Sequence, residues 1–166
     1  MRLLRLALFL LAVCVSALFS EPVYIDSCGI LFDTPEGWKP GFEGDMFVLT
    51  SPKGDIRLTI ESISTNGAGK SPDERHILLE WLFRQKIGKD FFADDIYEEE
   101  TAGLTGYAMT GMYYLDNGAK ASGYCGTLDK KERYILIMLT GIFQTPDDFR
   151  QTLSRLLAAV KDVSAP

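Results

Sequence analysis

The sequence has 166 residues, 46% of them hydrophobic, which is enough to bury one core and too few for two comfortable domains. Its 23 acidic residues outnumber 17 Lys and Arg residues and leave a net charge of −6. Because nucleic acids and anionic membrane surfaces bind basic surfaces, this charge argues against both as partners.

The first 17 residues have the plan of a secretory signal peptide. Arg2 and Arg5 precede an unbroken apolar run over 6–15, and small residues follow at 16–17. A membrane-spanning helix needs roughly 20 apolar residues, so this run is short for one. We therefore expect residues 1–17 to be removed on export and 18–166 to form a single domain, periplasmic or extracellular, with no transmembrane helix. A retained N-terminal anchor is the weaker alternative.

The three cysteines differ in the modification that each could carry. Cys14 stands where a bacterial lipoprotein carries its lipidated cysteine, but Val13 replaces the small residue that normally precedes it, so lipidation is a minor alternative. Cys28 and Cys125 stay in the mature chain and could form a disulfide in an oxidising compartment, worth about 4 to 5 kcal/mol in the chain-entropy account. Two buried free thiols are the other alternative, and the spacing alone does not decide between them.

The first half of the chain predicts short strands joined by turns. Extended chain over 23–33 ends in a Pro/Gly turn at 34–38. The segments 46–50 and 56–62 flank a hairpin turn, and the second alternates apolar with polar residues as a half-buried strand does. The small polar residues of 64–70 predict a surface loop.

A helix is predicted directly after that loop. Ser71 is a suitable N-cap, Pro72 suits the first helical position, Glu74 completes a capping box, and Gly88 ends the helix. Its apolar residues predict a wide buried face made of Ile77, Leu78, Leu79, Trp81, Leu82 and Phe83.

The second half predicts a hairpin, a central strand and a closing helix. Strands at 106–115 and 119–127 flank Asp-Asn-Gly, a strong type I′ turn signal. The continuous apolar run 134–139 is typical of a strand covered on both faces. Thr145 caps a last helix whose apolar stripe extends to Val160. Tight hairpins together with two helices indicate an α+β fold in which an antiparallel sheet is flanked by helices.

Reaction chemistry is poorly represented in the sequence. His76 is the only histidine and lies inside the predicted helix, so a histidine triad or a four-ligand zinc site is nearly excluded. The residues before Ser71 resemble the end of a phosphate-binding loop, but Ser64 stands where that motif requires glycine. We expect no catalytic residue, no metal and no cofactor.

An acidic run over 90–100 is the main alternative source of chemistry. Its carboxylates could hold a divalent cation or serve a small hydrolase, but the run lacks the ligand order and the turn glycine of a calcium loop. If 98–100 is a strand, neighbouring carboxylates point to opposite faces and cannot converge on one ion. We expect a solvated edge that discourages unwanted strand pairing.

The order of motifs resembles that of the PsbP-like and DcrB-like domain superfamily. The residues that carry the likeness are Phe-Asp-Thr-Pro-Glu-Gly-Trp at 32–38 after an opening strand, and Thr-Pro-Asp-Asp-Phe at 145–149 at the start of the closing helix. The resemblance spans nearly the whole mature chain. It implies a PsbP-like sandwich and a non-enzymatic accessory role, and it carries over no partner-binding residue.

These observations predict an exported binding or accessory protein of the cell envelope that acts on a protein or small ligand. Trp38 and Phe42, in the Pro/Gly-rich turn, are the candidate binding residues, with the 64–70 loop beside them. A carboxylate-dependent hydrolase and a chaperone that holds apolar segments are the alternatives.

Overall fold

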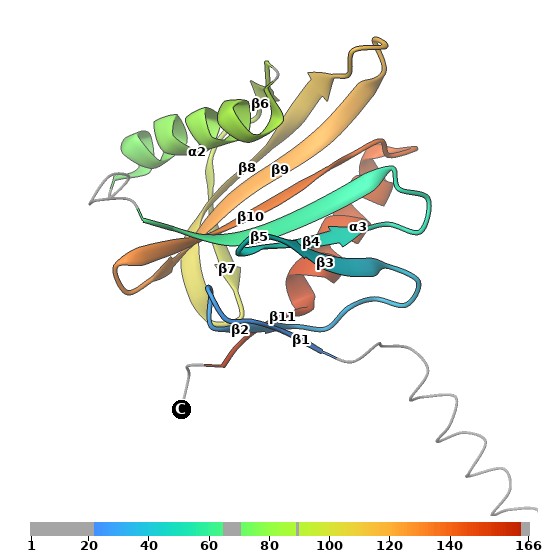
Figure 1. The fold of residues 1–166 in the computed structure, drawn as a ribbon. Helices are drawn as coiled ribbons and strands as arrows, with labels where there is room; N and C mark the ends of the chain where they lie inside the picture. The colour runs from blue at the N-terminus through green and yellow to red at the C-terminus, as the bar shows by residue number, and fades with distance from the viewer. Residues whose placement is uncertain (1–21, 65–70, 89, 164–166) are drawn as a thin grey trace, which may run out of the picture.

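The computed structural model describes residues 22–64, 71–88 and 90–163. Its main feature is an eight-stranded antiparallel sheet with helices on both sides, as predicted (Figure 1). The strands follow the order β3, β4, β5, β10, β9, β8 and β6, and β7 also pairs with β8. Their bounds are β3 Lys39–Glu43, β4 Met46–Thr50, β5 Ile56–Ser64, β6 Phe92–Ala93, β7 Tyr97–Thr101, β8 Leu104–Tyr114, β9 Lys120–Lys130 and β10 Arg133–Gly141.

A second, small sheet joins the two ends of the described chain. Strands β1 (Val23–Ile25) and β2 (Ile30–Phe32) lie in the segment 23–33 that is predicted to be extended, and a turn over 26–29 separates them. The third strand, β11 (Val160–Asp162), pairs antiparallel with β2. The prediction that Val160 belongs to the last helix was therefore wrong, because pairing with β2 takes it out of the helix.

The two helices begin where the capping signals predict. Helix α2 (Pro72–Ile87) has Ser71 as N-cap with both bonds of the capping box, and Gly88 ends it with a left-handed backbone. Helix α3 (Pro146–Ala158) is capped by Thr145, whose hydroxyl accepts from the Asp148 N–H. None of the helices in the described parts of the chain is long and apolar enough to cross a membrane.

A separate hydrophobic core packs against each face of the large sheet. On one face, the core lies between the sheet, α3 and the small sheet, and it includes Phe32, Phe47, Tyr124 and Phe149. On the other, α2 packs through Leu79, Leu82 and Phe83, and Phe83 stacks on Phe91 at 3.8 Å between ring centroids. The central strand β10 contributes to both cores, as its continuous apolar run predicts.

The buried face of α2 differs from the predicted one. Ile77 and Trp81, expected in the apolar face, are exposed, and Arg75 is buried instead. The helix packs on the sheet through positions 75, 79, 82 and 83, which share one side at helical spacing. Residues 77 and 81 lie outside that side, so their side chains face solvent.

Candidate functional site

A cleft of about 1140 Å³, the α3 cleft, lies between α3 and the sheet. It exists because the β8–β9 hairpin runs well past α3, which leaves part of the sheet face without a helix on it (Figure 1). Thr110, Met112, Lys120 and Ser122 from β8 and β9 line it. The other lining residues come from β6 and β7 on one side, and from α3 and the preceding Phe143 on the other.

Exposed aromatic rings gather at one wall of the α3 cleft. The side chain of Phe92 in β6 is 57% exposed and that of Tyr97 in β7 is 39% exposed. Phe92 also meets the exposed ring of Tyr114 edge-on, with 6.2 Å between the centroids. Large apolar side chains that remain exposed together beside a cleft are typical of an interaction surface.

The acidic groups of the α3 cleft are held by neighbouring hydroxyls. Asp94 accepts a hydrogen bond of 2.7 Å from Thr110, and Glu99 accepts one of 3.0 Å from Thr101. Arg150 of α3 also lines the cleft and is paired with Asp147 at 2.9 Å. The cleft therefore offers aromatic surface and oriented carboxylates together.

Two tyrosine hydroxyls near this wall stay protonated at neutral pH. Burial, with the nearby charges of Glu99 and then Asp94, raises the pKa of Tyr97 to about 12. Burial raises the pKa of Tyr124 well above its usual value, and its hydroxyl has no hydrogen-bond partner in the part of the chain that the structure describes. Tyr97 can therefore donate a hydrogen bond to a ligand over the whole physiological range.

We expect Tyr97 to make the protein less stable at high pH. Its pKa in the folded state, about 12, lies above its ordinary value of 10.0, so between these values the unfolded state loses the proton first. Stability therefore falls as the pH rises through this window. The tyrosinate absorbance of Tyr97→Phe should lack one late-titrating group, and its unfolding should depend less on alkaline pH than that of the unsubstituted chain. An unchanged absorbance titration would contradict the assignment.

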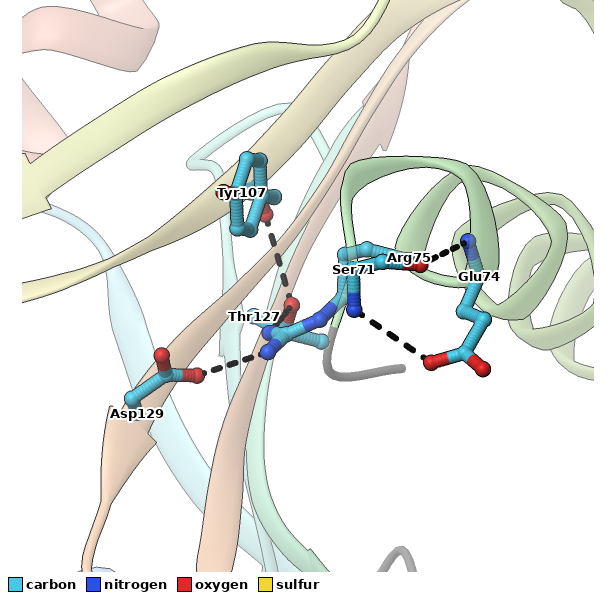
Figure 2. Close-up of polar contacts among 6 residues, drawn as sticks. All are labelled: Ser71, Glu74, Arg75, Tyr107, Thr127 and Asp129. Atoms are coloured by element: carbon cyan, nitrogen blue, oxygen red, sulfur yellow. Dashed lines mark hydrogen bonds and ion pairs between the residues drawn. The ribbon is translucent and has the colours of Figure 1, made fainter. Parts of the chain in front are cut away.

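On the opposite face of the sheet, Arg75 joins α2 to β9 (Figure 2). Its guanidinium donates to the Thr127 hydroxyl at 2.7 Å and to an Asp129 carboxylate oxygen at 2.9 Å. It also lies over the ring of Tyr134, with 3.9 Å from Cζ to the centroid. The burial of Arg75 could have been predicted from its helical spacing from Leu79 and Leu82, which places all three on one side of α2. It was not predicted because a charged residue is expected to face solvent.

Next to this contact a smaller hollow, of about 490 Å³, lies along the acidic strand β7. Glu98, Glu100, Tyr107 and Asp129 are among the residues that line it. By the alternation of a strand, Tyr97 and Glu99 share the α3 face while Glu98 and Glu100 share the α2 face. Glu99 and Glu100 each line both hollows, and Glu98 lines the smaller one alone. The predicted acidic run therefore supplies carboxylates to two separate hollows, on opposite faces of one strand.

The residues predicted as binding residues, Trp38 and Phe42, lie near β3, at the other edge of the sheet from β7. Phe42 is 54% exposed and meets Phe47 edge-on at 5.6 Å. Trp38 is partly buried and packs against the core between the sheet and α3. Neither lines the α3 cleft, and the loop expected beside them lies, from residue 65 to 70, outside the described residues.

The burial of these two residues predicts different costs of truncation. Phe42→Ala should lower the free energy of unfolding by less than about 1 kcal/mol, because its ring is half in water at a sheet edge. Trp38→Ala should cost about 2 kcal/mol, since it removes a ring that packs on the core. Urea unfolding of both variants measures the difference. Equal costs would mean that Trp38 is no better packed than Phe42.

Cys28 and Cys125 are free, buried thiols, so the disulfide alternative is not the one that the structure shows. Cys28 belongs to the core on the α3 side and Cys125 to the core under α2, which places the sheet between them. Burial raises the pKa of both thiols.

The single histidine, His76, lies half exposed on α2, with its Nε2 atom 3.5 Å from the Oε1 atom of Glu80. In the described residues, no group of three His, Cys, Asp or Glu side chains could hold a metal ion.

Neither a scan of protein-family models nor a search of curated proteins finds a match to this chain. Solved structures do match. The solution structure of cyanobacterial PsbP (CyanoP) from Synechocystis has a TM-score of 0.65 at 11% identity, covering 88% of this chain and 93% of that one. The Ran-binding protein Mog1p of Saccharomyces cerevisiae has a TM-score of 0.60 at 10% identity, with coverages of 86% and 95%.

A third solved structure, LpqN of Mycobacterium tuberculosis, is described as involved in cell envelope biogenesis. Its TM-score is 0.53 at 13% identity, and the match covers 85% of this chain and 88% of that one. At such low identities the likeness concerns the fold, including the antiparallel sheet between helices. The chain therefore has the PsbP-like fold that its sequence motifs predict.

Proposed function

We propose that this chain is an exported, non-catalytic accessory protein of the cell envelope that binds a partner protein or small ligand in the α3 cleft. The observation that carries the proposal is the exposed pair Phe92 and Tyr97 at the wall of this cleft of about 1140 Å³. Water-exposed rings of this size gain most from a ligand that covers them. The signal-like residues 1–17 support export, and the neighbour involved in cell envelope biogenesis is compatible with this compartment.

Site-specific photocrosslinking in living cells tests the binding site. A photoreactive phenylalanine analogue at Phe92 should give a discrete crosslinked product in the envelope fraction. The same analogue at Tyr24, which is 51% exposed on the small sheet, is the matched control and should give none. Products at both positions would indicate unspecific contact and contradict the proposal.

The same experiment at Phe42 separates the α3 cleft from the surface first predicted. A product at Phe42 and none at Phe92 would move the binding site to β3 and refute the cleft. N-terminal sequencing of the chain recovered from the envelope tests export, with cleavage after residue 17 as the expected result. A lipid on Cys14 would instead make the domain anchored.

A carboxylate-dependent hydrolase is the second candidate, because Asp94 and Glu99 both line the α3 cleft. Once a crosslinked ligand is identified, incubating it with the protein decides between the two. The accessory role predicts that the ligand is recovered intact, with equal results for the unsubstituted chain and for Glu99→Gln. Turnover that Glu99→Gln abolishes would establish the hydrolase. A chaperone for purely apolar segments fits less well, since charged side chains line the cleft.

A further inference from the structure

Strand β7 is an open edge of the large sheet. Among the described strands it pairs with β8 alone. Its hairpin turns through Ala102 and Gly103, which both have positive φ, so Thr101 and Leu104 form the closing pair of a type I′ turn. Because hydrogen-bonded and non-bonded pairs alternate from there, the backbone N–H and C=O groups of Glu98 and Glu100 point away from β8.

The opposite edge of the sheet, β3, is interrupted by a proline. Its hairpin ends in the pair Glu43 and Met46, and the same alternation places Pro40 at an outward-facing position. Proline has no N–H to donate, so β3 lacks a donor where an added strand would need one. No proline lies in β7, so β7 keeps both outward donors, those of Glu98 and Glu100, whereas β3 keeps only that of Phe42.

The two faces of β7 differ in chemistry. On the α3 side, the cleft presents the rings of Phe92, Tyr97 and Phe143. The carboxylates of Asp94 and Glu99 on this side accept hydrogen bonds from Thr110 and Thr101. On the α2 side, the smaller hollow presents the carboxylates of Glu98 and Glu100. A strand added beside β7 would send alternate side chains into these two hollows.

We propose that β7 binds an extended segment of a partner protein by strand addition, with apolar side chains in the α3 cleft and alternating Lys or Arg side chains against Glu98 and Glu100. This inference rests on the proposed binding role of the cleft. Backbone hydrogen bonds supply affinity and the two hollows supply the alternating pattern. A second copy of this chain is a poor occupant, because its own β7 would bring a run of glutamates against these glutamates.

Fluorescence anisotropy with a labelled peptide of four Lys-Val repeats tests the proposal on the full chain. The peptide should bind, and Glu98→Gln/Glu100→Gln should weaken binding by roughly three- to tenfold at low salt, as two exposed ion pairs allow. The matched control Glu36→Gln/Asp45→Asn makes the same charge change near β3 and should leave binding unchanged. Thermal unfolding of each variant checks that the fold is kept.

Glu100→Pro separates strand addition from simple charge attraction. It removes one outward N–H and one carboxylate, so it should weaken binding more than Glu100→Gln, by up to about tenfold beyond it. A peptide with the same residues in two blocks, Lys₄Val₄, should bind more weakly than the alternating one. Equal binding of Glu100→Pro and Glu100→Gln, or of the two peptides, would overturn strand addition.

Failure of this inference differs from failure of the proposed function. If the alternating peptide does not bind while the photoreactive group at Phe92 still gives a specific product, the cleft binds a ligand of another class and strand addition is refuted. If neither gives a signal, the binding role of the cleft is refuted as well.

Discussion

Gly106→Ala should destabilise the protein by at least about 3 kcal/mol, beyond the usual cost of overpacking. A methyl group at position 106 would come within 1.8 Å of the Thr127 carbonyl oxygen and 2.9 Å of the Leu128 Cα. Both atoms are backbone of β9, so they cannot rotate away as a side chain can. The substitution therefore has to separate β8 from β9 in the middle of the large sheet.

Gly41→Ala is the matched control, because it is the same chemical change in strand β3 and a methyl group there meets no atom within 4 Å. Its effect should lie within about 0.5 kcal/mol. Chemical denaturation followed by circular dichroism measures both variants. If Gly106→Ala were as stable as Gly41→Ala, the close approach of β8 and β9 at this residue would be wrong.

Local sequence signals predicted most of the regular elements. The helix starts at Ser71 and Thr145 follow from N-cap and proline chemistry, and the β8–β9 hairpin forms where Asp-Asn-Gly predicts it. The predicted type I′ turn was wrong, because only Gly118 of this turn has a positive φ and the Leu115 N–H donates to the Ala119 carbonyl across a three-residue loop. These signals act within a few residues, so they are readable without knowledge of the rest of the fold. Strand β5 alternates apolar with polar residues, and β10 is apolar over 134–139 because both of its faces contact a core.

The missed elements are strands whose own residues do not favour a strand and which depend on pairing with another strand. Strand β3 contains Pro40 and Gly41, which are poor strand formers, and it is extended because β4 pairs with it. Strand β11 pairs with β2 from the other end of the chain, and nothing in its three residues indicates this. Local propensity is a weak guide where tertiary pairing decides.

The candidate site was missed for the same reason. The α3 cleft lies between β6 and β7 on one side and α3 on the other. Helix α3 begins about 50 residues after the start of β7, so no local pattern connects the two sides of the cleft. The sequence shows that Phe92 and Tyr97 are aromatic, but it does not show whether an aromatic side chain is buried in a core or exposed at a binding surface. Their exposure in the structure makes this distinction. The acidic run was correctly expected to divide between two faces, although not to line a hollow on each.

Arg75→Ala should lower the free energy of unfolding by about 3 kcal/mol. The side chain of Arg75 is only 2% exposed and its guanidinium donates to Thr127 and Asp129. Truncation therefore removes two charge-assisted hydrogen bonds and a contact with the ring of Tyr134. This loss is near the lower limit of the cost of breaking a buried ion pair, about 3 to 5 kcal/mol. The reason is that the Asp129 side chain is 47% exposed, so its carboxylate is solvated by water once Arg75 is removed. Urea unfolding gives the value.

Two variants isolate the contribution of the guanidinium group. Arg75→Met keeps most of the apolar stem and should recover about half of the loss. Arg84→Ala is the control on the same helix: its partner Asp90 is 3.6 Å away and both side chains are largely exposed, so it should cost less than about 0.5 kcal/mol. Equal costs for Arg75→Ala and Arg84→Ala would contradict the role of Arg75 in holding α2 to β9.

Arg75→Met should change peptide binding in the opposite direction from stability. Asp129 lines the same hollow as Glu98 and Glu100, and Arg75 neutralises part of its charge. Loss of the guanidinium makes this hollow more negative, so the Lys-Val peptide should bind more tightly, and the gain should shrink as salt screens the charges. A variant that unfolds more easily yet binds a basic strand better would separate the structural role of Arg75 from the electrostatics of the β7 edge. Weaker binding at every salt concentration would show instead that the edge depends on the docking of α2.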